Sequence, residues 1–241
     1  AEKDARAFSS WLRSGRGLSR WRIIQLENAS HREITREVKR AASTVRRRGT
    51  LWIYFAGHGM VDENGARGLM GVDANSMDPA SKMILIEDMI QTTLKRGRAW
   101  RVVVIVDAGF GNVGRDGLEL VPGHLPPEPE VLPGRKDVII WTADEGLAGA
   151  PAWAEGQHGL FTWLTLGALR GWADGALGDE PNGRVSLAEA QTYIDTTAHA
   201  LGYPTNPTLD PVEDNRDWTL IQSDALEVGP DAATLRALSE S

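Results

Sequence analysis

The chain has 241 residues, of which 41% are hydrophobic and 24% are charged, as in ordinary globular proteins that bury one substantial core. Its formal net charge of −7 disfavours a nucleic-acid partner, because an acidic surface repels phosphate. The absence of cysteine excludes disulfides and cysteine-ligated zinc.

Metal and membrane signals are also missing from the sequence. The five histidines lie far apart and show neither HxxxH nor HxH spacing, so we expect no metal and no other cofactor. No apolar run reaches the ~18–20 residues that span a bilayer, and no signal peptide is evident. We therefore expect no membrane association. This favours the cytoplasm over secretion without fixing the compartment.

The first part of the chain alternates helical and strand patterns. Apolar side chains recur on one face over residues 4–13, which predicts a helix. The run WRIIQLEN (21–28) predicts a strand, and residues 30–45 predict a second helix. Ser30 and Glu33 have the spacing of a capping box at its start.

Two later runs, LWIYFA (51–56) and RVVVIVD (101–107), are apolar throughout. Strands of this kind are typical of a parallel sheet that is covered on both faces. Between them the pattern predicts a short strand or hairpin arm over 68–75 and a helix over 85–97.

The C-terminal half begins with a proline-rich stretch over 121–134 that predicts a loop. Further elements follow: a strand over 137–144, a helix over 158–172, a helix over 186–202 and a strand over 217–221. Ser186 and Glu189 form a second capping-box pattern. The residues after Ser223 are acidic and weakly patterned.

This alternation predicts an α/β fold with a mainly parallel central sheet flanked by helices. Sheets of this kind usually begin with a strand before the first helix, and no strand pattern precedes the helix over 4–13. We therefore expect the first strand to be missing from this chain or to be supplied by another polypeptide.

Two predicted strands end in glycine-containing turns, where the sites of open parallel sheets form. His58 stands between Gly57 and Gly59, directly after the strand 51–56. An imidazole held there suits general acid–base chemistry. Asp107 ends the strand 101–107. Either feature alone fits a surface histidine or a loop cap, but their pairing about fifty residues apart favours a functional site.

The two turns resemble those of caspase-like cysteine peptidases, especially bacterial caspase homologues and metacaspases. IYFAGHG is similar to the family's Y-F-S/A-G-H-G, and DAGFGN to its D-A-C-F/H-S-G. EKDARAF, LMGVDAN and HGLFTWLTLGALRG extend the likeness to about Ile221.

The resemblance implies a caspase-like three-layer sandwich over residues 1–223. Its parts would be a large-subunit-like part (1–120), a proline-rich linker (121–135) and a small-subunit-like part (136–223), followed by an acidic tail (224–241).

The resemblance also implies a role for each site residue. His58 matches the catalytic base, and the amide of Gly59 matches an oxyanion donor. Gly109 falls at the nucleophile position and keeps the family's second oxyanion amide. Asp107, with Asp4, matches an acidic pocket for a substrate Arg or Lys, whose donors two carboxylates can share.

The missing thiol decides the expected activity, because a thiolate is the attacking group in this chemistry. Gly109 has no side chain, and the chain has no cysteine elsewhere. Loss of a nucleophile costs on the order of 10⁶ in rate. We therefore expect no working cysteine peptidase in the chain as written.

Four interpretations stay open. The first is a pseudo-peptidase that binds a peptide or protein partner, favoured because Gly109, Gly111 and Asn112 all depart from the family pattern. The second is a cysteine endopeptidase cleaving after Arg or Lys whose cysteine was replaced at position 109 by engineering. The third is another hydrolase using His58 and Asp107, with or without a metal. The fourth is a plain interaction or structural domain.

Overall fold

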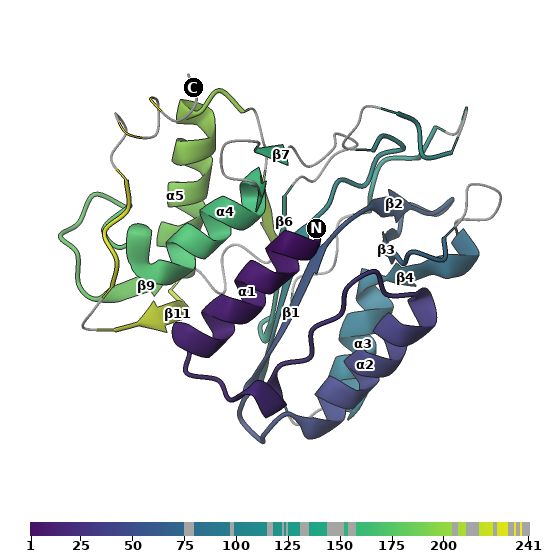
Figure 1. Cartoon of the computed structure of the whole chain (residues 1–241), viewed down its shortest axis with the longest axis horizontal. Helices are drawn as coiled ribbons and strands as arrows, with labels where there is room; N and C mark the ends of the chain where they lie inside the picture. The colour runs from purple at the N-terminus through teal and green to yellow at the C-terminus, as the bar shows by residue number, and fades with distance from the viewer. Residues whose placement is uncertain are drawn as a thin grey trace.

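A four-stranded sheet forms the centre of the computed structural model (Figure 1). The structure describes residues 1–74, 80–96, 99–114, 118–121, 123, 125–130, 135–143, 152–153, 158–203, 207–210, 217–223, 226–230, 234 and 237. The sheet has the order β1-β5-β6-β10. Its strands are β1 (Thr50–Ala56), β5 (Arg101–Asp107), β6 (Val138–Thr142) and β10 (Thr208–Asp210). The first three are parallel, and β10 is antiparallel to β6.

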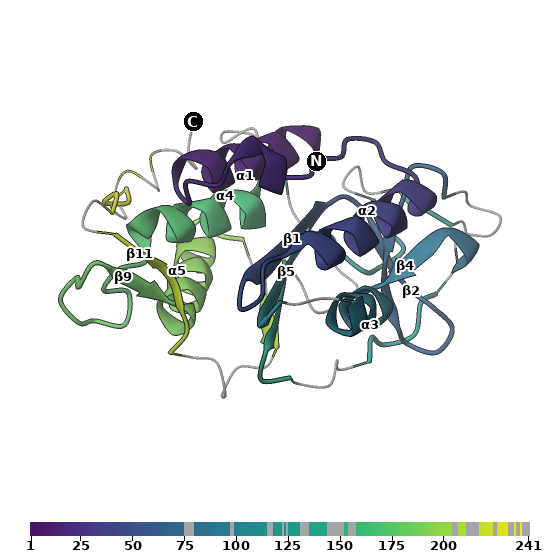
Figure 2. The same cartoon turned by 90° about the horizontal axis from the view of Figure 1, so that it is seen from below.

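Helices cover both faces of this sheet (Figure 2). One face carries α1 (Glu2–Ser14), α4 (Leu160–Gly167) and α5 (Leu187–Ala200), and the other carries α2 (His31–Thr44) and α3 (Ile86–Arg96). The buried apolar side chains accordingly form two clusters, one on each side of the sheet. The predicted three-layer α/β sandwich is confirmed.

Burial differs between the central strands and the edge strand. β5 is buried from Val102 onward and β6 throughout, whereas β1 is only half-buried from Leu51 to Ala56. The register of the β1–β5 pair sets Ala56 opposite Asp107. The carboxyl ends of the two strands therefore lie level, which places the turns that follow them side by side.

Both predicted capping boxes are present. The hydroxyl of Ser30 accepts the N–H of Glu33, whose carboxylate accepts the N–H of Ser30 at 2.9 Å. Ser186 and Glu189 make the same exchange at the start of α5. Because each box satisfies two otherwise unpaired backbone donors, the local sequence fixes where these helices begin.

Two sequence predictions were wrong in part. Residues 21–28 form no strand: a 3-10 turn (Arg20–Arg22) leads into an extended segment that joins no sheet. The helix over 158–172 is interrupted, because a π-type turn follows Gly167 and Gly171 takes a φ of +120°, which favours glycine. The predicted late strand is present as β11 (Thr219–Gln222), which pairs outside the central sheet.

The smaller strands form three satellite sheets. β11 pairs with β9 (Arg184–Ser186), β7 (Ala152–Trp153) pairs with β8 (His158–Gly159), and β2 (Gly59–Val61), β3 (Arg67–Met70) and β4 (Met83–Leu85) make a three-stranded sheet. The described residues of the predicted linker form no helix or strand. Most of the predicted acidic tail lies outside the described residues. Among the described helices, none is long and apolar enough to cross a membrane.

Replacing Trp141 tests the core on the α4 face. Its side chain is 1% exposed, and its indole N–H donates to Gln191 Oε1 at 2.8 Å. Trp141→Ala is expected to lower the free energy of unfolding by about 3–5 kcal/mol, since it leaves a large cavity. Trp21, which is 92% exposed, is the control. Trp21→Ala is expected to change the free energy of unfolding by less than about 0.5 kcal/mol. Urea denaturation measures both, and similar effects at the two positions would contradict the core assignment.

Candidate functional site

The turns after β1 and β5 are joined by main-chain hydrogen bonds. The Gly57 N–H donates to the Asp107 carbonyl oxygen at 3.2 Å, and the Gly59 N–H donates to the Gly109 carbonyl oxygen at 3.1 Å. Main-chain bonding between the two segments thus continues past the strand ends, as far as Gly59 and Gly109. Since neighbouring strands lie ~4.8 Å apart, His58 and Gly109 are adjacent on the two turns.

Close packing explains the glycine after His58. A Cβ on Gly59 would lie 2.7 Å from the ring of Phe110 and 2.9 Å from the carbonyl oxygen of Gly109. His58 itself is exposed, and its carbonyl oxygen accepts the N–H of Met70 at 3.0 Å. The backbone of this turn is therefore held from two sides while the imidazole faces solvent.

The amide of Gly59 has a partner within the protein. An oxyanion donor must point at the place where negative charge develops. Here the Gly59 N–H points at the Gly109 carbonyl instead. In this conformation the expected donor is occupied by the turn that carries the nucleophile position.

Asp107 lies at the end of β5 and is 0% exposed. Its Oδ2 accepts the N–H of Thr162 at 3.2 Å and also the Thr162 hydroxyl. The Tyr54 hydroxyl lies 2.5 Å from Thr162 Oγ1. Because the Thr162 proton is directed at Asp107, the Tyr54 hydroxyl donates to Thr162. Hydrogen bonds therefore connect β1, α4 and β5.

Asp4, on α1, is 1% exposed. Its Oδ1 lies 2.7 Å from His158 Nδ1 and accepts the Gly159 N–H at 3.3 Å, and its Oδ2 lies 3.1 Å from the amino nitrogen of Ala1. Burial alone would raise the pKa of Asp4. The hydrogen bonds from His158, Ala1 and Gly159, with the charge of the Ala1 amino group, bring that pKa below its ordinary value.

The two carboxylates meet at the amino end of α4. Gly159 is the N-cap of this helix and supplies no side-chain cap, so Asp4 and Asp107 accept the N–H groups of Gly159 and Thr162. Negative charge suits this end of the helix dipole. Two predicted pocket residues, distant in sequence, are thus attached to one segment of five residues (158–162).

Three further residues of this site carried no sequence signal of their own. Thr162 and Tyr54 belong to ordinary helix and strand patterns, and His158 has no ligand spacing.

The departure from the family pattern at Asn112 has a structural reason. Its side-chain amide group donates to the Val121 carbonyl at 2.5 Å and accepts the Val121 N–H at 2.7 Å. This pair fastens the start of the proline-rich stretch to the turn after β5.

Within the described part of the chain, no three His, Asp or Glu side chains gather in a group that could hold an ion. The polar groups at the start of α4 form hydrogen bonds with one another and with the backbone N–H groups of the helix end. What the arrangement offers is a negatively charged cluster beside a histidine turn.

A parallel sheet with a histidine after one strand, level with the turn that would carry a nucleophile on the next strand, defines the caspase-like class of α/β domains. The family profile described as the caspase domain matches residues 1–191, and the chain belongs to this family. A search of curated proteins found no significant match.

Two threonines one turn apart on α4 give a matched test of the bond to Asp107. Thr162→Val removes the hydroxyl donor of a buried carboxylate, and is expected to lower the free energy of unfolding by about 1–3 kcal/mol. The Thr165 hydroxyl is buried and has no hydrogen-bond partner among the described residues. Thr165→Val is therefore expected to be neutral or stabilising. Chemical denaturation of both variants checks this, and an equal loss would contradict the role of Thr162.

The lowered pKa of Asp4 predicts a pH dependence. A carboxyl with a lowered folded-state pKa contributes stability above its unfolded pKa of ~3.9, which is lost as the pH falls through the folded value. Asp4→Asn is expected to destabilise the protein at pH 7, and the deficit is expected to shrink below about pH 4. Thermal unfolding from pH 7 to pH 3 measures the deficit. A deficit that stays constant or grows in acid would contradict this account. In a His158→Ala background the deficit caused by Asp4→Asn at neutral pH should be smaller.

Proposed function

We propose that this caspase-like domain binds a basic peptide or protein segment and does not cleave it. The observation that carries the proposal is Gly109, which lies beside His58 in a chain without cysteine. Without a thiolate at this position no acyl-enzyme can form. The histidine then has no nucleophile to deprotonate.

The bond between Gly59 and Gly109 supports the same conclusion independently. Loss of one oxyanion donor costs about 10²–10³ in kcat in hydrolases that depend on it. With the Gly59 N–H bonded to the Gly109 carbonyl, this turn favours a stable closed backbone over stabilisation of a transition state.

The carboxylates at α4 support a basic ligand. The helix dipole supplies the equivalent of about half a positive charge and the Ala1 amino group lies beside Asp4, which together do not fully offset the charges of Asp4 and Asp107. The donors to Asp107 Oδ2 from Thr162 are both neutral groups. A guanidinium or ammonium group would be attracted to this pair of carboxylates, and a guanidinium also offers a planar set of donors that fits carboxylates.

A second candidate is an endopeptidase cleaving after Arg or Lys in which glycine stands in place of cysteine. The backbone at Gly109 favours it. The positive-φ glycines of the described chain are Gly17, Gly65, Gly123, Gly171, Gly175, Gly178, Gly183 and Gly202. Since Gly109 is not among them, a side chain at position 109 would meet no strain of this kind.

Paired peptides test the proposed binding. A tetrapeptide amide ending in Arg is compared by calorimetry with the same peptide ending in citrulline, which has nearly the same shape and no charge. The Arg peptide is expected to bind roughly ten- to hundredfold more tightly, as for a charged hydrogen bond worth about 1.5–3 kcal/mol. Asp107→Asn is expected to reduce this preference, with Thr165→Val as the folded control. Equal binding of the two peptides would contradict a basic ligand.

Restoring the thiol separates the two candidates. Gly109→Cys is expected to give no His58-dependent hydrolysis of Arg or Lys peptides, because the Gly59 amide remains bonded to the carbonyl of residue 109. A fluorogenic assay compares Gly109→Cys with the double variant that also carries His58→Ala. Turnover that appears in the first and disappears in the second would favour the endopeptidase.

A further inference from the structure

The amino ends of the three parallel strands form the edge of the central sheet opposite the histidine turn, at the lower end of β1 in Figure 1. The register sets Thr50 of β1 opposite Arg101 of β5, so these ends lie level. Basic residues stand directly before the strands or begin them: Arg46, Arg47, Arg48, Arg101, Arg135 and Lys136. This amino edge therefore gathers cations from three separate parts of the sequence.

The arginines before β1 lie beyond the helix that precedes them. α2 ends at Thr44, and the Gly49 N–H donates to the Arg46 carbonyl at 2.8 Å in the turn that follows. The side chains of residues 46–48 are all exposed. The negative end of the α2 dipole is equivalent to about half a charge, which three cations exceed. The helix end alone does not account for this run.

Arg48 and Trp100 are held together at the surface. Arg48 has a φ of +64°, a left-handed conformation that residues other than glycine seldom adopt. Its guanidinium carbon lies 5.5 Å from the centroid of the Trp100 ring, which is 57% exposed. The Trp100 N–H donates to the Gly49 carbonyl at 2.9 Å. The turn before β1 thus presents an arginine beside an exposed aromatic ring.

A second arginine–tryptophan pair lies at the start of β5. The guanidinium carbon of Arg101 lies 3.9 Å from the centroid of the Trp218 ring, which packs against the apolar cluster on the α4 face. A guanidinium stacked on a ring keeps its N–H groups at its rim, where they can donate to a ligand.

The amino edge has more cations than carboxylates. Arg135 is paired, since its Nη2 lies 2.8 Å from Glu87 Oε1. In the part of the chain that the structure describes, no carboxylate lies within ion-pair distance of Arg101 or of residues 46–48. Two acidic residues adjoin the edge, Asp137 before β6 and Asp217 before Trp218. The edge is therefore positive overall.

The sign of this local charge is opposite to that of the whole chain, whose formal net charge is −7. Charges are screened beyond about 8 Å at physiological ionic strength, so a short ligand at the amino edge is attracted by the cations beside it. A long polyanion would extend over the acidic remainder of the surface and be repelled there. The distribution of charge therefore favours a short acidic segment over a nucleic acid.

We propose that the amino edge, with Arg46, Arg47, Arg48, Trp100 and Arg101 as its contact residues, is a docking surface for an acidic segment of a partner protein. Carboxylates accept strong, often paired hydrogen bonds from guanidinium groups. The exposed ring of Trp100 offers contact to an apolar side chain of the segment. Arginine and tryptophan are also the residue types that contribute most to protein interfaces.

This docking surface is separate from the candidate site. β1 has seven residues, which at 3.3 Å per residue puts its two ends roughly 20 Å apart. A partner segment can therefore occupy the amino edge without covering His58. The proposal does not depend on whether the site binds or cleaves a basic peptide.

Paired peptides test the proposed docking. A fluorescein-labelled EELEELEE peptide is compared with QQLQQLQQ, which has the same length and apolar residues but no side-chain charge. At low ionic strength the acidic peptide is expected to bind at least about tenfold more tightly, and to lose most of this advantage at high salt, because exposed charge pairs are screened. Fluorescence anisotropy measures both affinities. Equal binding of the two peptides would overturn the proposal.

Two double variants separate a local docking surface from attraction by net charge. Arg46→Gln with Arg47→Gln is expected to weaken binding of the acidic peptide about three- to tenfold, as for two exposed charge pairs. The matched control, Arg32→Gln with Arg184→Gln, removes the same charge from exposed positions at the starts of α2 and β9. It is expected to change binding by less than about twofold. Equal losses in the two double variants would overturn the proposal.

Trp100→Ala tests the aromatic part of the surface. The loss of this ring is expected to weaken binding of the acidic peptide at least about threefold, as for a tryptophan that contributes to an interface. The net charge is unchanged by this substitution, so a loss of affinity cannot come from long-range attraction. Unchanged binding would contradict the place of Trp100 in the docking surface.

A labelled single-stranded oligothymidylate is the competing probe. It is expected to bind more weakly than the acidic peptide, and tighter binding that depends on Arg46 and Arg47 would overturn the proposal in favour of a nucleic acid. The tetrapeptide amide ending in Arg is expected to bind the Arg46→Gln, Arg47→Gln variant as well as it binds the original chain. Failure of the docking surface is thereby distinguished from failure of the proposed function.

Discussion

The amino end of α4 is the point on which the domain depends. Asp4 brings α1 to it, Asp107 brings the end of β5, and Thr162 passes the connection on to Tyr54 of β1. Both carboxylates are almost fully buried, so each must keep its hydrogen bonds or incur a large desolvation cost. The amino end of α4 thus fixes how α1, β1 and β5 sit relative to one another.

The same cluster gives the site its chemical character. A cysteine peptidase site needs a base and a nucleophile together, whereas this chain has Gly109 beside His58. The carboxylates of Asp4 and Asp107 have a structural role at the start of α4 that does not depend on catalysis. In the function proposed here, the same carboxylates would also attract a basic ligand, and the bond between the Gly59 N–H and the Gly109 carbonyl is compatible with binding without cleavage.

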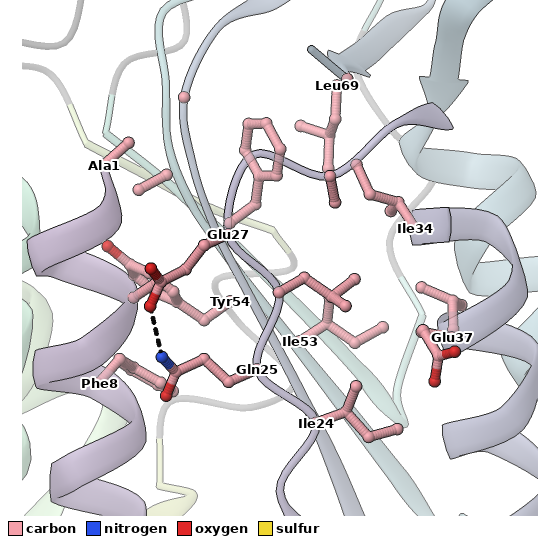
Figure 3. A pocket seen from close by; sticks show the side chains of 18 of the residues that line it. Ala1, Phe8, Ile24, Gln25, Glu27, Ile34, Glu37, Ile53, Tyr54 and Leu69 are labelled. Carbon is pink, nitrogen blue, oxygen red and sulfur yellow. Dashed lines mark hydrogen bonds between the residues drawn. The ribbon is translucent and has the colours of Figure 1, made fainter. Parts of the chain in front are cut away.

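Local sequence predicted what local forces decide. The capping boxes at Ser30 and Ser186, the apolar strands at β1 and β5, and the level turns at His58 and Gly109 all follow from short patterns. The role of Thr162 could not be predicted, because a threonine in the first turn of a helix has many partners available. The prediction of a strand over 21–28 was wrong for a different reason. The composition of this segment is that of a strand, but a strand needs a paired neighbour, and the space beside the segment is a cavity (Figure 3).

The central claim is that the domain retains recognition without cleavage, and prolonged incubation with a basic peptide tests it most directly. The protein is incubated with Arg- and Lys-containing peptides, and the masses of the recovered peptides are measured by mass spectrometry. The account predicts that the peptides break down no faster with the protein than without it. Cleavage after Arg or Lys that disappears in the His58→Ala variant would contradict it.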